Sequence, residues 1–156
     1  MKASKSKTPR KLLSSGSILG AIILVLAIFA GVMMTRMNSV PSDVDYATTR
    51  SSDNGLFKVS YTASTGTVPV NQMHQWTLHV ETADGQVVED AIISVDGDMP
   101  QHGHGMPTRP QVTEYLGNGN YLVEGMRFQM GGWWVMDFTI TANGQTDAVH
   151  FDMMLK

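Results

Sequence analysis

Residues 98–110, DMPQHGHGMPTRP, place imidazole and thioether side chains close together in the chain. His102, His104 and Met106 alternate with two glycines, so an extended segment would put the three side chains on one side, about 7 Å apart. The glycines permit bends that bring the side chains together, and the flanking prolines disfavour a helix. The pattern predicts a ligand-presenting loop, with a plain polar turn between strands as the alternative.

These side chains are typical ligands of a soft or intermediate metal ion. Imidazole suits copper, zinc, nickel or iron, whereas thioether specifically suits Cu(I). The chain has no cysteine, which excludes disulfides, thiolate catalysis and cysteine-bound zinc. The sequence therefore favours copper, as Cu(I) or Cu(II). The predicted metal ligands are Met99, His102, His104, Met106 and Met130, the last on condition that its segment meets the loop.

Strand parity separates other histidines and methionines from this set. His79 and His150 are out of phase with their apolar neighbours and are expected to point outward, whereas Met136 and Met153 are expected in the core. The chain contains no serine nucleophile elbow, phosphate-binding glycine loop or recognisable pair of catalytic carboxylates. We therefore expect a binding protein, not an enzyme.

The first residues predict a membrane anchor. The apolar run of residues 18–34 is about 17 residues long, near the minimum for a spanning helix. Five basic residues precede it and only Arg36 follows closely, which predicts a cytoplasmic segment at 1–17 and a single-pass anchor at 18–36. The remainder would then face the periplasm or the exterior. A cleaved signal peptide is the alternative.

Charge is distributed unevenly along the rest of the chain. Residues 38–156 carry all fourteen acidic residues against five basic ones, a formal charge of −9. Such a domain repels nucleic acid and suits a cationic partner. Residues 37–54 are polar and unpatterned, which predicts a tether. A loop that folds back onto the domain is the alternative.

Residues 55–156 alternate apolar and polar side chains in about seven short segments separated by turn signals. This pattern predicts an all-β fold, an immunoglobulin-like antiparallel β-sandwich of about seven strands. Asn143-Gly144 and the Gly-Asn-Gly at 117–119 are expected to close hairpins. The aromatic side chains expected in one core are Trp76, Trp134, Phe138 and Phe151, with Trp133 more exposed than Trp134.

The segment ISVDGDMPQHGHGMPTRPQVTEYLGNGNYLVEGMRFQMGGWWVMDFTI resembles the FixH and YtkA-like family of exported domains. The shared features are a Met-Pro-x-x-x-His-Gly loop after a strand, a Gly-x-Gly-x-Tyr hairpin and a Met-x-Gly-x-Trp entry into the next strand. The resemblance covers roughly residues 55–155. It implies an immunoglobulin-like sandwich on one transmembrane anchor, associated with copper handling or respiratory oxidase assembly.

By motif, the resemblance carries over Met99, Pro100, His104 and Gly105. Many relatives have a Met-Pro-x-Met sequence, and His102 stands in this chain where they have the second methionine. Two functions follow as alternatives. One is a membrane-anchored copper-binding or copper-delivery module, and the other is a non-metal accessory subunit that docks on a membrane respiratory or transport complex.

Overall fold

A computed structural model describes residues 20, 22–29 and 39–156. Residues 20 and 22–29 are helical, and among all described residues no helix is long and apolar enough to cross a membrane. The predicted cytoplasmic segment 1–17 and most of the predicted anchor 18–36 lie outside the described residues. The chain divides into two compact units, Met1–Ser39 and Val40–Lys156, and the second contains all the strands that the structure describes.

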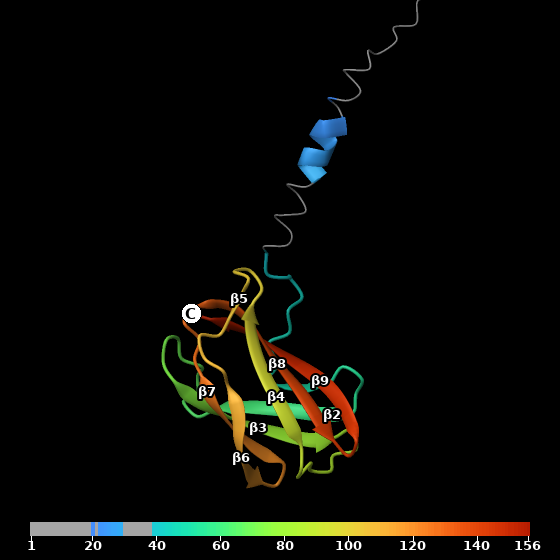
Figure 1. Cartoon of the computed structure of the whole chain (residues 1–156), viewed down its shortest axis with the longest axis vertical. Helices are drawn as coiled ribbons and strands as arrows, with labels where there is room; N and C mark the ends of the chain where they lie inside the picture. Colours follow the sequence, from blue (N-terminus) through green and yellow to red (C-terminus); the bar gives the residue numbers. More distant parts are fainter. Residues whose placement is uncertain (1–19, 21, 30–38) are drawn as a thin grey trace, which may run out of the picture. The chain divides into compact units, whose positions relative to one another are not determined.

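The second unit is all-β and consists of two antiparallel sheets (Figure 1). The five-stranded sheet has the order β1-β2-β3-β7-β6, and the four-stranded sheet has the order β5-β4-β8-β9. Nine strands are present in the described part of the chain, where the sequence predicts about seven, and the additional two are short. The strands are β1 (Thr49–Ser51), β2 (Phe57–Ala63), β3 (His74–Thr82), β4 (Ile92–Met99), β5 (His104–Gly105), β6 (Gln111–Gly117), β7 (Asn120–Met126), β8 (Gly132–Ala142) and β9 (Gln145–Leu155).

The two predicted turn signals close hairpins as expected. Asn143 and Gly144 have φ angles of 53° and 74° and connect β8 to β9, where Ala142 faces Gln145 across the hairpin. Both central residues of this turn adopt the left-handed conformation that matches the twist of the flanking strands. Residues 117–119 also have positive φ angles, and they connect β6 to β7.

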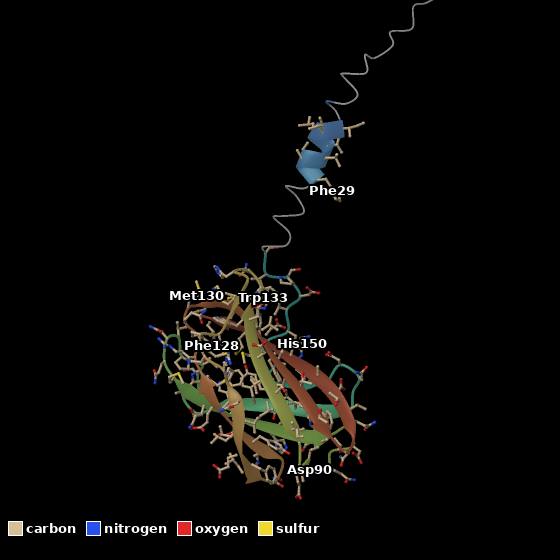
Figure 2. The ribbon with its side chains drawn as sticks, in the orientation of Figure 1. Phe29, Asp90, Phe128, Met130, Trp133 and His150 are labelled. Atoms are coloured by element: carbon tan, nitrogen blue, oxygen red, sulfur yellow. The ribbon has the colours of Figure 1, made fainter. Side chains whose placement is uncertain are left out.

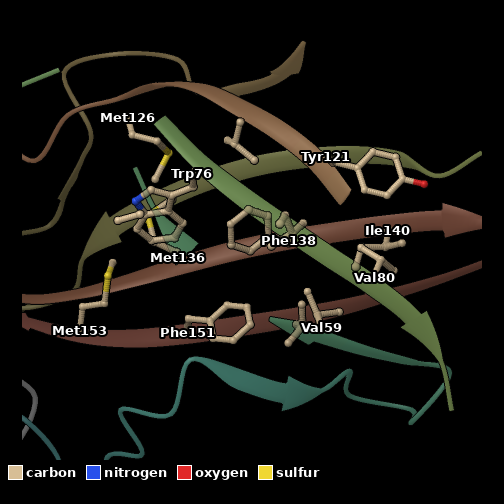
Figure 3. Close-up of a cluster of buried hydrophobic side chains, with 14 of the residues drawn as sticks. Val59, Trp76, Val80, Tyr121, Met126, Met136, Phe138, Ile140, Phe151 and Met153 are labelled. Atoms are coloured by element: carbon tan, nitrogen blue, oxygen red, sulfur yellow. The ribbon is translucent and has the colours of Figure 1, made fainter. Parts of the chain in front are cut away.

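The core lies between the sheets and contains the predicted aromatic residues, of which Figure 3 labels Trp76, Phe138 and Phe151. Trp76, Trp134, Phe138 and Phe151 are each fully buried. The rings of Trp76 and Phe138 lie 6.3 Å apart across the two sheets, and those of Phe138 and Phe151 lie 5.9 Å apart. Trp133 is only partly buried and donates a hydrogen bond of 2.8 Å to Asp152, so the predicted strand phase is confirmed.

Part of the predicted tether belongs to the domain. Residues Thr49–Ser51 form β1 and pair with β2, and the backbone N–H of Asp53 donates to the carbonyl of Ala148 at 2.8 Å. These contacts correspond to the fold-back alternative. The backbone groups of β1 are hydrogen-bonded within the domain, whereas those of an extended tether would be hydrogen-bonded to water.

Asp147 ties the start of the domain to β9. Its carboxylate accepts hydrogen bonds from the backbone and side chain of Asn54, and from the backbone of Leu56 and Ala148. Burial raises the pKa of Asp147, but these bonds and that of Ser52 outweigh the effect and lower the pKa to about 2. The folded state therefore favours the ionised form of the Asp147 carboxylate.

Candidate functional site

The predicted loop is a hairpin at the edge of the four-stranded sheet. β4 continues to Met99, turns, and returns as β5, with Met99 paired to His104. The backbone N–H groups of His102 and Gly103 both donate to the Met99 carbonyl at 2.9 Å. Gly103 has a φ of 64°, which favours glycine at this position. The turn therefore presents His102 at its tip and returns the chain beside Met99.

The two histidines of the hairpin are neighbours. Their ring centroids lie 5.8 Å apart. His102 is exposed, whereas His104 is half-buried, with its ring 6.2 Å from that of Trp134. Because Met99 and His104 form a cross-strand pair, their side chains lie on the same face, which is the inner one. The expectation that the alternating residues share one side holds for His104 and Met106, both half-buried.

The loop and the segment containing Met130 meet, which the sequence left open. Gln129 Nε2 lies 3.1 Å from His104 Nδ1 and donates to the Gly105 carbonyl at 3.1 Å. Met130, labelled in Figure 2, is adjacent and 37% exposed. Its carbonyl accepts a hydrogen bond from the Trp134 indole. The condition on which Met130 was included among the predicted ligands is therefore met.

Methionine side chains fill the space left by two glycines. A Cβ atom at Gly97 would lie 2.5 Å from Met136 Sδ and 2.9 Å from Met106 Sδ, so the two sulfur atoms approach the same point on the inner face of β4. Likewise, a Cβ atom at Gly132 would lie 2.6 Å from the methyl carbon of Met99. Thioether groups therefore gather below the hairpin that carries the two imidazoles.

The burial of Met99 corrects one expectation. The predicted ligand-presenting loop places Met99 and Met106 outside the apolar face of the strands, and from this we expected that removing either would spare the fold. Met99 is instead fully buried at the end of β4, and Met106 packs against the core. Met99 therefore contributes to the stability of the fold, in addition to any role as a ligand.

His104 can act as a metal ligand through Nε2. Its Nδ1 lies 3.2 Å from the Gly105 carbonyl. Nδ1 can donate its proton to that carbonyl, which leaves the lone pair of Nε2 free to bind an ion, or it can accept a hydrogen bond from Gln129 Nε2, which places the proton on Nε2. The first tautomer is the usual arrangement for histidine ligands. Among the residues that the structure describes, no three histidine or acidic side chains lie close enough to hold a metal by themselves.

The remaining histidines expected to point outward do so. His79 is partly exposed, with Nε2 3.3 Å from Glu81 and Nδ1 3.1 Å from the Asn120 side chain. His150 is exposed, with Nδ1 3.6 Å from Asp53. Both rings contact surface partners that do not belong to the hairpin, which makes them suitable controls.

The outer face of the four-stranded sheet is acidic next to the hairpin. Asp96 and Asp137 are direct cross-strand partners, and Asp98 lies beside Gly105 of β5. Burial raises the pKa of Asp137, His150 lowers it, and the charges of Asp96 and Asp98 raise it further. Such a face increases the local concentration of cations close to the hairpin.

Several residues of the site were not predicted from the sequence. Gln129, Trp134 and Met136 come from other strands and connections, and only the fold brings them to the hairpin. Gly97 is the one residue whose type indicates these contacts from the sequence, because a glycine within a strand often marks the close approach of other atoms.

Fold and site together define a small antiparallel β-sandwich domain with a histidine- and methionine-bearing hairpin at the edge of one sheet. Residues 51–139 match the YtkA-like family, and the chain belongs to that family. The resemblance stated from the sequence is thereby confirmed. No curated protein matches this chain.

A solved structure with some likeness is the ZirS C-terminal domain. It is 12% identical over 97% of this chain and 86% of that one, with a TM-score of 0.36. A likeness at this level supports no conclusion about fold or function.

Proposed function

We propose that this protein is a membrane-anchored, extracytoplasmic copper-binding module that carries copper to an acceptor such as a respiratory oxidase under assembly. The observation that carries the proposal is the pairing of two adjacent imidazoles, His102 and His104, with the thioether of Met106 on one hairpin. Imidazole binds both oxidation states of copper, and thioether adds preference for Cu(I). We further propose that the two sheets form an immunoglobulin-like sandwich, and that residues 18–36 span the membrane once.

The ligands differ in how readily they reach an ion. His102 is exposed at the tip, and His104 and Met106 are half-buried beside it, so these three form the primary set. Met130 is next, because it is 37% exposed on the segment that Gln129 joins to His104. Met99 is fully buried, so it contributes to coordination only if the hairpin moves away from Trp134.

A copper titration tests the proposal directly. The double substitution His102→Ala with His104→Ala should abolish Cu(II) binding, and Met106→Leu should weaken Cu(I) binding measured against a competing chelator. Leucine preserves the apolar volume of methionine, so the second change removes the sulfur without emptying the site. His79→Ala and His150→Ala are the matched controls and should leave the affinity unchanged.

The result also separates the two candidate functions. If the unmodified protein cannot compete for copper, or the hairpin substitutions leave its affinity unchanged, the copper proposal is wrong. The hairpin, with its exposed His102 and Met130, would then be a contact surface of an accessory subunit. Co-purification with a membrane complex that depends on these two side chains would support that second function.

A further inference from the structure

His74 is a buried histidine with an unused ring nitrogen. It is the first residue of β3, is 6% exposed and faces the core with Trp76. Its Nδ1 lies 3.1 Å from the Gln72 carbonyl, and its Nε2 has no hydrogen-bond partner in the structure. If Nδ1 carries the proton and donates it to the carbonyl, Nε2 presents a bare lone pair inside the protein.

A methionine lies directly across from this histidine. His74 pairs with Met126 of β7, and both side chains are on the buried face, as cross-strand partners must be. The rings of Phe128 and Trp76 lie 5.7 Å and 6.4 Å from the His74 ring. Figure 3 shows the Met126 side chain beside the Trp76 indole. One imidazole and one thioether therefore meet within an aromatic enclosure.

We propose that His74 Nε2 and Met126 Sδ bind one Cu(I) ion at an interior site that is separate from the hairpin. A buried nitrogen without a partner is destabilising, so it calls for an ion or a water molecule. Both ligands are neutral, which disfavours a divalent ion in a buried position. The face of an indole such as that of Trp76 attracts a monovalent cation.

An entry route lies beside the histidine. A surface pocket of about 350 Å³ is lined by His74 together with Met73 and Glu124. Met73 is 54% exposed and offers a thioether at the opening, and Glu124 offers a negative charge, although it accepts a hydrogen bond of 2.7 Å from Gln75. A cation can therefore be attracted at the surface and passed inward to His74.

The competing explanation is one buried water molecule. The Trp76 indole N–H is also without a partner, so a water could accept from it and donate to His74 Nε2. A water would make no use of the Met126 sulfur, whereas Cu(I) requires it. Replacing that sulfur alone therefore distinguishes the two explanations.

The test uses the full chain in detergent micelles, under anaerobic conditions, with Cu(I) and a competing chelator. The hairpin is first disabled by His102→Ala, His104→Ala and Met106→Leu. We expect this chain to retain one Cu(I), and the further change Met126→Leu to weaken binding at least about 10-fold. Met153→Leu is the matched control, because it makes the same change at a core methionine of the other sheet and should leave the retained ion unaffected.

Two further measurements distinguish the loss of a ligand from misfolding. His74→Phe removes the ligand nitrogen but keeps a ring in the core, and it should also abolish the retained ion. In the unmodified chain, Ag(I) as a redox-inert probe should shift the ¹³C-methyl NMR signal of Met126 and not that of Met153.

The interior site is refuted if the hairpin-disabled chain binds no Cu(I), if neither Met126→Leu nor His74→Phe changes its binding, or if Ag(I) leaves the Met126 signal in place. Loss of all copper on disabling the hairpin would leave the hairpin proposal standing. Unchanged copper binding on disabling it would refute the hairpin and favour the interior site.

Discussion

Introducing a methyl group at Gly97 should destabilise the domain by crowding two sulfur atoms. The Cβ atom of Gly97→Ala would lie 2.5 Å from Met136 Sδ and 2.9 Å from Met106 Sδ, both well inside van der Waals contact. Met106 is half-buried and can turn outward, but Met136 is fully buried and can move only by displacing other core side chains. We expect a loss of about 2 kcal/mol in the free energy of unfolding, within the usual range for an overpacked core.

The assay is urea unfolding of residues 40–156, followed by tryptophan fluorescence. Gly103→Ala is the control for the loss of a glycine in the same hairpin, because no atom lies within 4 Å of its Cβ position and only its positive φ is strained. A double substitution tests the mechanism: Met136→Ala makes room for the new methyl, so Gly97→Ala should cost at least about 0.5 kcal/mol less in that background. Strictly additive effects would show that the Met136 sulfur does not lie over Gly97.

Four further predictions follow from burial, charge and topology. Met99→Ala should cost about 2–5 kcal/mol in urea unfolding and Met106→Ala distinctly less, because only Met99 is fully buried; the reverse order would contradict this placement. Trp76→Ala should cost about 3–5 kcal/mol in the same assay, and a loss below about 1 kcal/mol would mean that its strand faces the other way. Asp147 has its pKa lowered from 3.8 to about 2, so its ionisation stabilises the fold above pH 3.8 and that contribution is lost as the pH falls toward 2. The difference in urea midpoint between the unmodified domain and Asp147→Asn should therefore be largest near neutral pH and shrink over that interval, and a pH-independent difference would exclude the carboxylate charge as its cause. A reporter that is active only in the cytoplasm should be silent when fused after Lys156, and strong activity would refute the proposed topology.

Six of the seven longer strands could be predicted because their side chains alternate between a more buried and a more exposed face. The other, β6, has no buried residue, and the turn signal at residues 117–119 marks its end. The alternation places Trp134, Met136 and Phe138 on one side before any contact is known. The same reasoning cannot detect β1 and β5, which contain three and two residues. Strands of that length are defined by their backbone pairing, and the pairing depends on parts of the chain that are distant in sequence.

The misplacement of Met99 has a specific cause. The apolar run at residues 91–95 is followed by Asp96, Gly97 and Asp98, which are typical of a turn, so the sequence alone gives no reason to extend the strand to Met99. In the structure the alternation continues, with both aspartates on the exposed face and Gly97 and Met99 on the buried one. Gly97 lies on the inner face but has no apolar side chain, so the continued alternation of β4 could not be recognised from the sequence.

The contacts around the hairpin depend on the fold as a whole. Gln129 is 25 residues from His104, and the two meet only because the connection after β7 passes the edge of β5. No local pattern gives such a contact. The methionines of the core raise a similar difficulty, because parity assigns Met136 to the interior without indicating that its sulfur lies next to that of Met106.

The graded burial of the hairpin side chains bears on how the proposed copper site would release its ion. A carrier must hold an ion tightly enough to protect it and loosely enough to release it, so ligands that are all buried or all exposed serve poorly. Here the His102 imidazole is exposed, and the His104 imidazole is half-buried against Trp134. The half-buried Met106 thioether lies close to that of Met136, which is fully buried. An acceptor could replace the outermost ligand first while the inner ones still hold the ion. Transfer would then require no unfolding of the core, and the exposed His102 is the side chain at which we expect exchange to begin.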